Sequence, residues 1–139
     1  MFIENVSFLD IISGYHTAPR PDKSLLIQIV DPNMEFPTPA RPFNRVEQFA
    51  FYDVENNDPL FEEGGFTQEE AARMAALLKE AYENDMDVIV HCVAGVWRSG
   101  AIVEVATLIG FPDPLLYRSP SATVKTMLMR ALDLTPTFE

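Results

Sequence analysis

The chain has 139 residues, of which 47% are hydrophobic and 22% are charged. This length and composition predict one soluble domain, residues 1–139, built around one hydrophobic core. Its 10 basic residues against 21 acidic ones give a formal net charge of −11, which argues against nucleic-acid binding because affinity for phosphate backbones comes largely from clustered lysine and arginine.

The first ten residues, MFIENVSFLD, include acidic side chains and no basic ones, so they do not resemble a secretory signal peptide. No apolar run approaches the length of a membrane span. The single cysteine, Cys92, excludes an internal disulfide and fits a reducing compartment. We therefore expect a cytoplasmic protein that does not bind membranes.

Hydrophobic patterning divides the first half of the chain into two strands and two loops. The stretch SLLIQIV, Ser24–Val30, is rich in leucine and isoleucine and ends at Asp-Pro, which predicts a strand. Four prolines make residues 31–42 an irregular loop. Alternation of residue types predicts a short strand within Arg45–Val54, and residues 55–65 have the composition of a loop.

The next two elements are a helix and a buried strand. Thr67 and Glu70 have the spacing of a capping box, so a helix should begin here and run to about Glu83. Its apolar positions fall on one face at helical spacing, namely Ala71, Met74, Ala75, Leu78 and Tyr82. The short apolar stretch Asp87–Val90 predicts a strand buried on both faces.

Two further helices complete the pattern. One is expected from Ser99 to Ile109, ended by Gly110 and Pro112. The last begins at Ser119 and Pro120 and turns four apolar side chains inward, Val124, Met127, Leu128 and Ala131. Because strands alternate with helices, the sequence predicts an α/β fold with a central, mostly parallel sheet flanked by helices.

A reactive cysteine is predicted where the buried strand meets the following helix. Cys92 follows the strand, Gly95 lies in the turn, and Arg98 and Ser99 lead into the helix. Ligands bind at this edge of open α/β sheets, where the amides of a turn and a helix N-terminus attract anions. The helix N-terminus and a neighbouring cation also favour the thiolate form of a cysteine.

Arg98 points to phosphate as the anion. Its planar guanidinium binds two oxygens at once, which suits phosphate better than a lysine does. Ser99 is placed to donate a hydrogen bond to the sulfur. Together these residue types predict nucleophilic attack of Cys92 on phosphorus through a covalent phosphocysteine.

The segment HCVAGVWRS, His91–Ser99, resembles the H-C-x-x-G-x-x-R-[ST] signature of cysteine-dependent protein tyrosine phosphatases, especially the compact dual-specificity type. All five defined positions match. The resemblance implies a dual-specificity-phosphatase-like fold and hydrolysis of phosphotyrosine, extending to phosphoserine and phosphothreonine, with no metal or cofactor. It implies Cys92 as the nucleophile, Arg98 as the phosphate binder and Ser99 as a helper in breaking down the intermediate.

The resemblance also assigns roles to the rest of the loop. His91 would orient the loop from beneath, and the phosphate would be held by the backbone amides of Val93, Ala94, Gly95, Val96, Trp97 and Arg98. Trp97 departs from the small residue that many relatives carry at this position. Its indole could narrow the rim, stack on an aromatic substrate or pack against a neighbouring loop.

The family's general acid is an aspartate on a loop upstream of the cysteine, and two residues compete for that role. Asp53 lies 39 positions before Cys92 and follows the alternating part of the second strand. Asp58 lies 34 positions before Cys92 and precedes a proline. We favour Asp53 because its position after a strand is the firmer cue. Either residue would also serve as general base for the attacking water.

Two alternative functions stay open at this point. One is a phosphate-binding module without turnover, against which the intact Cys92, Arg98 and Ser99 argue. The other is the same loop chemistry on a phosphorylated RNA end or a small molecule, and the acidic composition argues against RNA. No group of histidine, cysteine and carboxylate residues has metal-ligand spacing. The expected partner is a phosphorylated protein or peptide.

Overall fold

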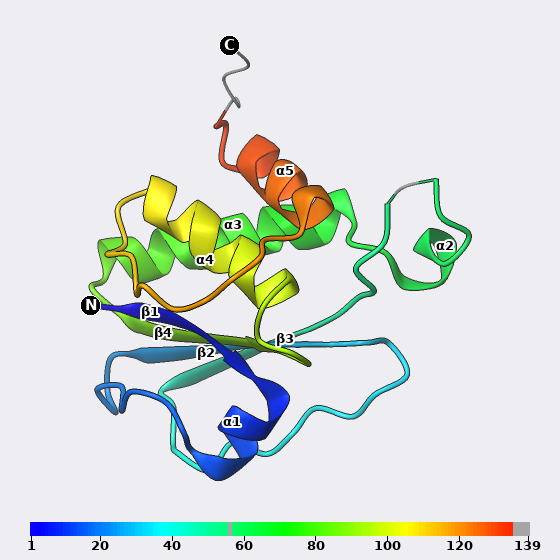
Figure 1. Cartoon of the computed structure of the whole chain (residues 1–139). Helices are drawn as coiled ribbons and strands as arrows, with labels where there is room; N and C mark the ends of the chain where they lie inside the picture. The colour runs from blue at the N-terminus through cyan, green and yellow to red at the C-terminus, as the bar shows by residue number, and fades with distance from the viewer. Residues whose placement is uncertain (56, 135–139) are drawn as a thin grey trace.

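A four-stranded sheet forms the centre of the computed structural model, which describes residues 1–55 and 57–134. The strands lie in the order β1 (Ile3–Ser7), β4 (Asp87–Cys92), β2 (Ser24–Val30) and β3 (Arg45–Ala50), and every neighbouring pair is parallel (Figure 1). This confirms the predicted α/β fold with a parallel sheet. All four strands therefore end at the same edge, where the Cys92 loop begins.

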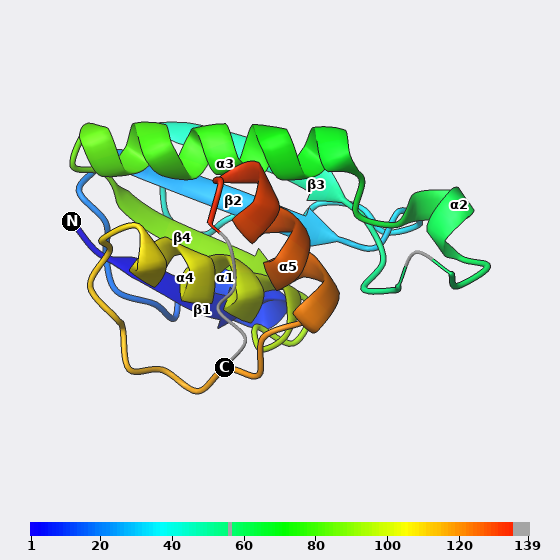
Figure 2. The same cartoon turned by 90° about the horizontal axis from the view of Figure 1, so that it is seen from above.

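The helices cover the sheet on both faces. Two of them, α3 (Gln68–Glu83) and α4 (Arg98–Leu108), cover one face, and α5 (Ala122–Ala131) packs against both on the same side. The short α1 (Phe8–Ser13) lies on the other face (Figures 1 and 2). The short α2 (Phe61–Gly64) stands to one side in the connection from β3 to α3 (Figure 1).

Burial on both faces explains the apolar sequences of the two central strands, β2 and β4. Every residue of β2 and of β4 is buried, because each strand has a neighbour on both sides and helices on its faces. The larger cluster lies under α3, α4 and α5, and a smaller one lies under α1, made of Val6, Ile11, Leu26 and Ile89. Cys92 belongs to the larger cluster, so the predicted nucleophile is part of the core.

Several boundaries differ from those predicted, each for a local reason. β1 and α1 were not predicted, because β1 carries three polar residues and α1 is a six-residue helix. The predicted loop 55–65 contains α2, a single helical turn of four residues. β3 ends at Ala50 rather than Val54, since its partner β2 ends at Val30, the residue opposite Ala50. The last helix starts at Ala122, with the Ser121 side chain accepting the capping hydrogen bond from the Val124 amide.

Smaller corrections concern the helix faces and ends. The capping box of Thr67 and Glu70 is confirmed. Tyr82, predicted on the inner face of α3, is 39% exposed and places its ring centroid 5.6 Å from that of Phe111. Ala131, in the last turn of α5, is exposed rather than buried. β4 continues past Val90 to Cys92, and α4 begins at Arg98 and ends at Leu108, one residue before the predicted bound at each end.

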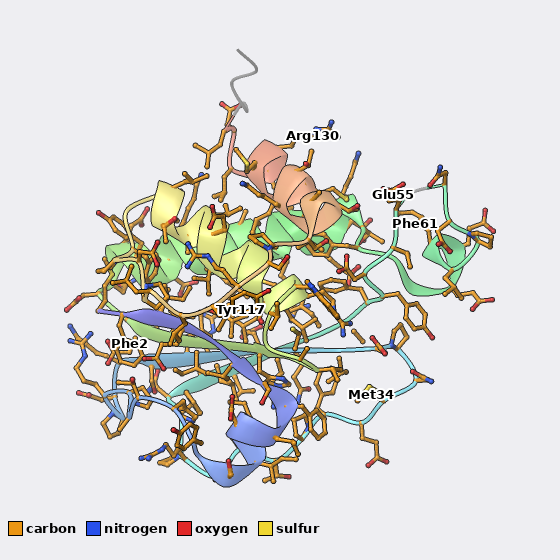
Figure 3. All side chains as sticks on the ribbon, viewed as in Figure 1. Phe2, Met34, Glu55, Phe61, Tyr117 and Arg130 are labelled. Carbon is orange, nitrogen blue, oxygen red and sulfur yellow. The ribbon has the colours of Figure 1, made fainter. Side chains whose placement is uncertain are left out.

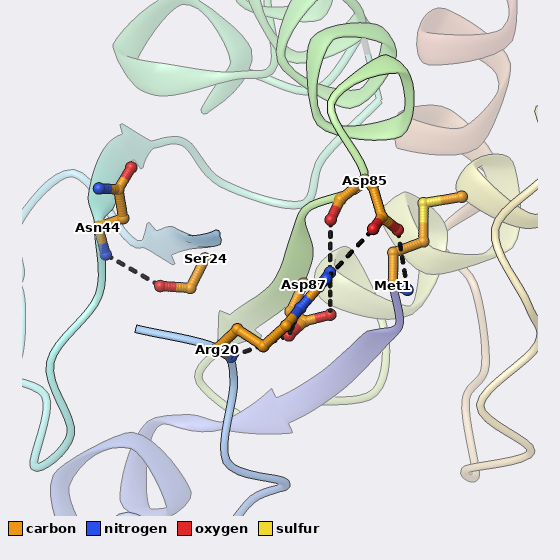
Figure 4. Close-up of polar contacts among 6 residues, drawn as sticks. All are labelled: Met1, Arg20, Ser24, Asn44, Asp85 and Asp87. Atoms are coloured by element: carbon orange, nitrogen blue, oxygen red, sulfur yellow. Dashed lines mark hydrogen bonds and ion pairs between the residues drawn. The ribbon is translucent and has the colours of Figure 1, made fainter. Parts of the chain in front are cut away.

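Ion pairs lie at the opposite edge of the sheet, where β4 begins. Arg20 binds Asp87 at 3.0 Å and Asp85 at 3.1 Å, and the amino group of Met1 lies 3.1 Å from Asp85 (Figure 4). The hydrogen bond from Arg20 lowers the pKa of Asp85.

Within residues 1–55 and 57–134, every helix is too short or too polar to cross a bilayer.

Candidate active site

Cys92 occupies the last position of β4, between the ends of β1 and β2. Its residue is 2% exposed, and its sulfur lies 3.2 Å from the hydroxyl oxygen of Ser99 in the first turn of α4. Strand register places Cys92 opposite Ser7 of β1. The structure thus brings the predicted nucleophile and the predicted helper into contact at the carboxyl edge of the sheet, where α/β folds bind ligands.

The turn from β4 to α4 depends on Gly95. Its φ is +75°, and a β-carbon there would lie 2.5 Å from the carbonyl carbon of Val6 and 2.6 Å from the amide nitrogen of Ser7. Any other residue would meet both the left-handed backbone penalty and the backbone of β1. The close approach is fixed by Asn5, whose side-chain amide donates to the Gly95 carbonyl at 2.8 Å.

The carbonyl groups of this loop bond to its surroundings. Four of them accept hydrogen bonds from backbone groups or side chains outside the loop, namely those of Val93, Gly95, Val96 and Trp97. By contrast, no amide from 93 to 98 donates a hydrogen bond to another residue that the structure describes. Because the carbonyls are engaged and the amides are not, the loop presents a row of donors suited to an anion.

Arg98 is held by one of its two terminal nitrogens. Its Nη1 donates to Asp31 Oδ1 and to the carbonyl of Phe51, both at 2.7 Å. Its Nε and Nη2 donate to no residue in the described part of the chain, and the side chain is 10% exposed. The edge of the guanidinium that binds two oxygens at once is therefore available.

His91 lies beneath the loop, buried in the sheet. It is fully buried, its ring stands edge-on to Phe8 at 6.3 Å, and neither ring nitrogen has a hydrogen-bond partner among the described residues. Burial lowers the pKa of His91 to about 4; contact with the Cys92 backbone opposes this shift, and the charge of Arg98 adds to it. The imidazole is therefore neutral at pH 7 and supports the loop by packing rather than as a cation.

Asp53 is linked to the loop, whereas Asp58 is engaged elsewhere. Asp53 is exposed, and its Oδ1 accepts a hydrogen bond from the Ser121 hydroxyl at 2.5 Å. The Ser121 amide in turn donates to the Trp97 carbonyl at 3.1 Å, so one residue joins the loop between β4 and α4 to Asp53. Asp58 instead accepts from the amide of Leu60 at 2.9 Å in the turn before α2.

The connection from α4 to α5 supports the loop from outside. Arg118 is 13% exposed on its side chain and binds Glu104 at 2.7 Å and Asp113 at 3.0 Å. These bonds hold the segment from which the Tyr117 carbonyl meets Asn5 and the Ser119 amide meets Val96. Hydrogen bonding to Arg118 also lowers the pKa of Asp113 to about 2.

The rim and the larger hollows complete the surroundings. Trp97 is 56% exposed and Val93 is 41% exposed, so both side chains of the loop are partly open to solvent. Two hollows of about 690 and 530 Å³ lie elsewhere. Tyr117 lines the first, and Phe61 and Arg130 line the second; Figure 3 labels these three residues. Neither is lined by Cys92. No cluster of three potential metal ligands occurs in the described residues.

Three site residues were missed by sequence reasoning: Asp31, Ser121 and Asn5. Asp31 directly follows β2, and knowing that β2 lies beside β4 would have placed it at this edge. Ser121 precedes a helix, which predicts a cap but not a contact with Asp53. Asn5 lies in β1, the strand that the sequence pattern did not reveal.

Comparison with known proteins supports the fold. No family model and no curated protein matches the sequence. The crystal structure of human DUSP28 matches with a TM-score of 0.58 and 12% identity, covering 94% of this chain and 91% of that one. A mouse putative dual specificity phosphatase complexed with zinc tungstate matches with a TM-score of 0.50 and 14% identity, covering 81% and 70%. The chain thus has the compact dual-specificity-phosphatase-like fold.

Proposed function

We propose that this chain is a cysteine-dependent phosphatase that hydrolyses phosphotyrosine, and also phosphoserine or phosphothreonine, through a phosphocysteine intermediate. One arrangement carries the proposal, and all of its parts belong to one turn. The Cys92 thiol is buried, and within residues 1–55 and 57–134 neither the amides 93–98 nor the Nε–Nη2 edge of Arg98 has an acceptor. A phosphoryl group offers three oxygens to these donors while its phosphorus faces the sulfur.

The first chemical step transfers the phosphoryl group to sulfur. The Cys92 thiolate attacks phosphorus, the sulfur–phosphorus bond forms, and the bond to the leaving oxygen breaks. Arg98 and the loop amides stabilise the negative charge on the three remaining oxygens. Asp53 donates its proton to the leaving oxygen, so that an alcohol or phenol departs instead of an anion.

The second step returns the enzyme to its starting state. Asp53, now a carboxylate, takes a proton from water as the water oxygen attacks phosphorus and the sulfur–phosphorus bond breaks. The sulfur leaves as a thiolate, and a hydrogen bond donated by the Ser99 hydroxyl, 3.2 Å away, stabilises that negative charge. Inorganic phosphate is the second product, and no metal or cofactor enters the scheme.

Three further observations support the proposal. The fold is one that dual specificity phosphatases adopt. The mouse protein was crystallised with tungstate, a tetrahedral oxyanion of phosphate-like shape. The Ser121 hydroxyl connects Asp53 to the same loop that holds the nucleophile.

The decisive experiment follows turnover and the intermediate together. Wild-type protein should release phosphate from p-nitrophenyl phosphate and from a phosphotyrosine peptide, and Cys92→Ser should abolish release. Rapid acid quenching of Asp53→Asn with radiolabelled substrate should leave label attached to the protein. Undiminished hydrolysis by Cys92→Ser would refute the mechanism. Tight binding of the phosphopeptide by wild-type protein with no release would instead favour a phosphate-binding module.

A further inference from the structure

We propose that Asp31 is a positioning residue that fixes the guanidinium of Arg98 in the orientation needed to bind phosphate. The inference rests on the proposed function, because it assigns Arg98 to the phosphoryl oxygens. It starts from an ion pair that the motif itself does not contain. Asp31 lies 67 positions before Arg98, outside the His91–Ser99 segment.

The hydrogen-bond pattern of Arg98 shows how this orientation arises. Nη1 carries two hydrogens, and the structure gives it two acceptors at 2.7 Å, Asp31 Oδ1 and the Phe51 carbonyl. With both hydrogens engaged, the guanidinium plane is set by two fixed points. The remaining donors, on Nε and Nη2, form the edge that matches two oxygens of a phosphate.

The backbone around Asp31 is itself constrained. Pro32 fixes the next φ angle, and a β-carbon on Gly64 would lie only 2.4 Å from the Pro32 ring. The absence of a side chain at Gly64 therefore allows this residue to pack against Pro32. The Gly64 carbonyl also accepts a hydrogen bond from the Tyr52 amide, in the segment after β3, at 2.6 Å. The Phe51 amide also donates to the Val30 carbonyl at 3.0 Å, so the two acceptors of Nη1, Asp31 and Phe51, lie on neighbouring backbone segments joined by a hydrogen bond.

The ion pair between Arg98 and Asp31 is partly buried, so its loss is expected to affect the binding of anions. The Arg98 side chain is 10% exposed and that of Asp31 is 34% exposed, so the pair is screened less than a surface pair. Without Asp31, the guanidinium would keep only the Phe51 carbonyl and would rotate about its side-chain torsions. The free energy needed to order the guanidinium at each binding event would then weaken the binding of phosphate-shaped anions.

The test compares three variants in two assays of function and one of stability. Asp31→Ala removes the acceptor, whereas Asp31→Asn keeps an acceptor oxygen for Nη1 and removes the charge. Asp85→Ala is the matched control, because Asp85 also pairs with an arginine, Arg20 at 3.1 Å, at the opposite edge of the sheet (Figure 4). For each variant, calorimetry measures the affinity for tungstate, and steady-state kinetics with p-nitrophenyl phosphate give KM and kcat. Thermal unfolding gives Tm.

The expected results separate positioning from stability. Asp31→Ala should weaken tungstate binding and raise KM by about tenfold or more, the effect of losing one charge-assisted hydrogen bond. Asp31→Asn should stay within about threefold of wild type, because its amide oxygen accepts the same bond. Asp85→Ala should lower Tm and leave the tungstate affinity unchanged.

Each other outcome overturns the inference in a recognisable way. A lower Tm for Asp31→Ala with unchanged tungstate affinity and KM would make Asp31 merely structural. An Asp31→Asn variant as impaired as Asp31→Ala would show that the charge, not the bond, matters. If wild type binds tungstate without turnover, the proposed function fails and the tungstate comparison still decides Asp31. If wild type does neither, both proposals fail.

Discussion

At the scale of single residues, His91 couples folding to pH. Its pKa of about 4 in the folded protein lies below the usual 6.5 because the ring is buried. Between these two values the unfolded chain binds the proton and the folded protein does not, so stability rises with pH in this window and falls as pH drops from 6.5 toward 4.

The resulting prediction concerns the free energy of unfolding at two pH values. Between pH 7 and pH 5, wild type should lose about 2 kcal/mol more than His91→Gln, since glutamine does not titrate. Urea denaturation of both proteins at each pH measures the difference. Equal losses in the two proteins would mean that His91 is not kept neutral by burial.

Asp53 and Asp58 can be told apart by the contacts they make. Asp53 is tied to Ser121 and thereby to the loop between β4 and α4, whereas Asp58 accepts a hydrogen bond within its own turn. Asp53→Asn should lower kcat on a phosphotyrosine peptide by roughly 10²–10⁴ and remove the basic limb of the pH–rate profile. Asp58→Asn should keep the wild-type kcat and the basic limb of the pH–rate profile. The reverse pattern would reassign the general acid.

The sequence predicted those site residues that lie together in the chain. Cys92, Gly95, Arg98 and Ser99 share one turn, so residue types and spacing define their chemistry directly. Asp31 and Ser121 reach the site through the order of the strands and the path of the connection to α5. Neither a hydrophobic period nor a capping pattern contains that information, because both describe only neighbours in sequence.

At the scale of elements, the turn between β4 and α4 requires glycine at position 95. Gly95→Ala should lower Tm and also abolish measurable tungstate binding, because the new β-carbon would overlap the backbone of Val6 and Ser7 and displace the amides. Gly14→Ala is the control. It has the same φ of +75°, but its β-carbon would meet a side chain at 3.3 Å, away from the loop.

The two glycine variants distinguish backbone strain from a displaced site. Gly14→Ala should lose stability from the left-handed backbone alone and keep the wild-type affinity for tungstate. Calorimetric titration and thermal unfolding of both variants provide the comparison. Normal tungstate affinity in Gly95→Ala would show that the loop tolerates a shift against β1, so that close approach to β1 would no longer explain the glycine.

Elements with strong local signals were predicted from sequence, and elements defined by their neighbours were not. The all-buried strands β2 and β4 are apolar over most of their length, and α3 carries both a capping box and a helical period. β1 is an edge strand with polar residues, so its place beside β4 comes from pairing rather than from composition. The end of β3 is likewise set by where β2 stops.

At the scale of the whole molecule, the charge distribution bears on the choice of substrate. The net charge is −11, and six of the ten basic side chains take part in ion pairs, Arg20, Arg45, Arg73, Arg98, Arg118 and Lys125. Positive charge is therefore largely neutralised locally, including that of Arg98 before a substrate arrives. A polyanion approaching the loop between β4 and α4 meets an electrostatic field that opposes it.

This field predicts that kcat/KM for RNA increases with salt concentration, whereas the activity of an enzyme built to bind nucleic acid decreases. With a 5′-phosphorylated RNA oligonucleotide, kcat/KM should be at least about tenfold below that of a phosphotyrosine peptide at low salt and should rise as salt screens the repulsion. Hydrolysis of p-nitrophenyl phosphate, a small substrate, should change less. An RNA activity that falls steeply with added salt would instead require a cationic groove that releases counterions, and would make the RNA end the better substrate class.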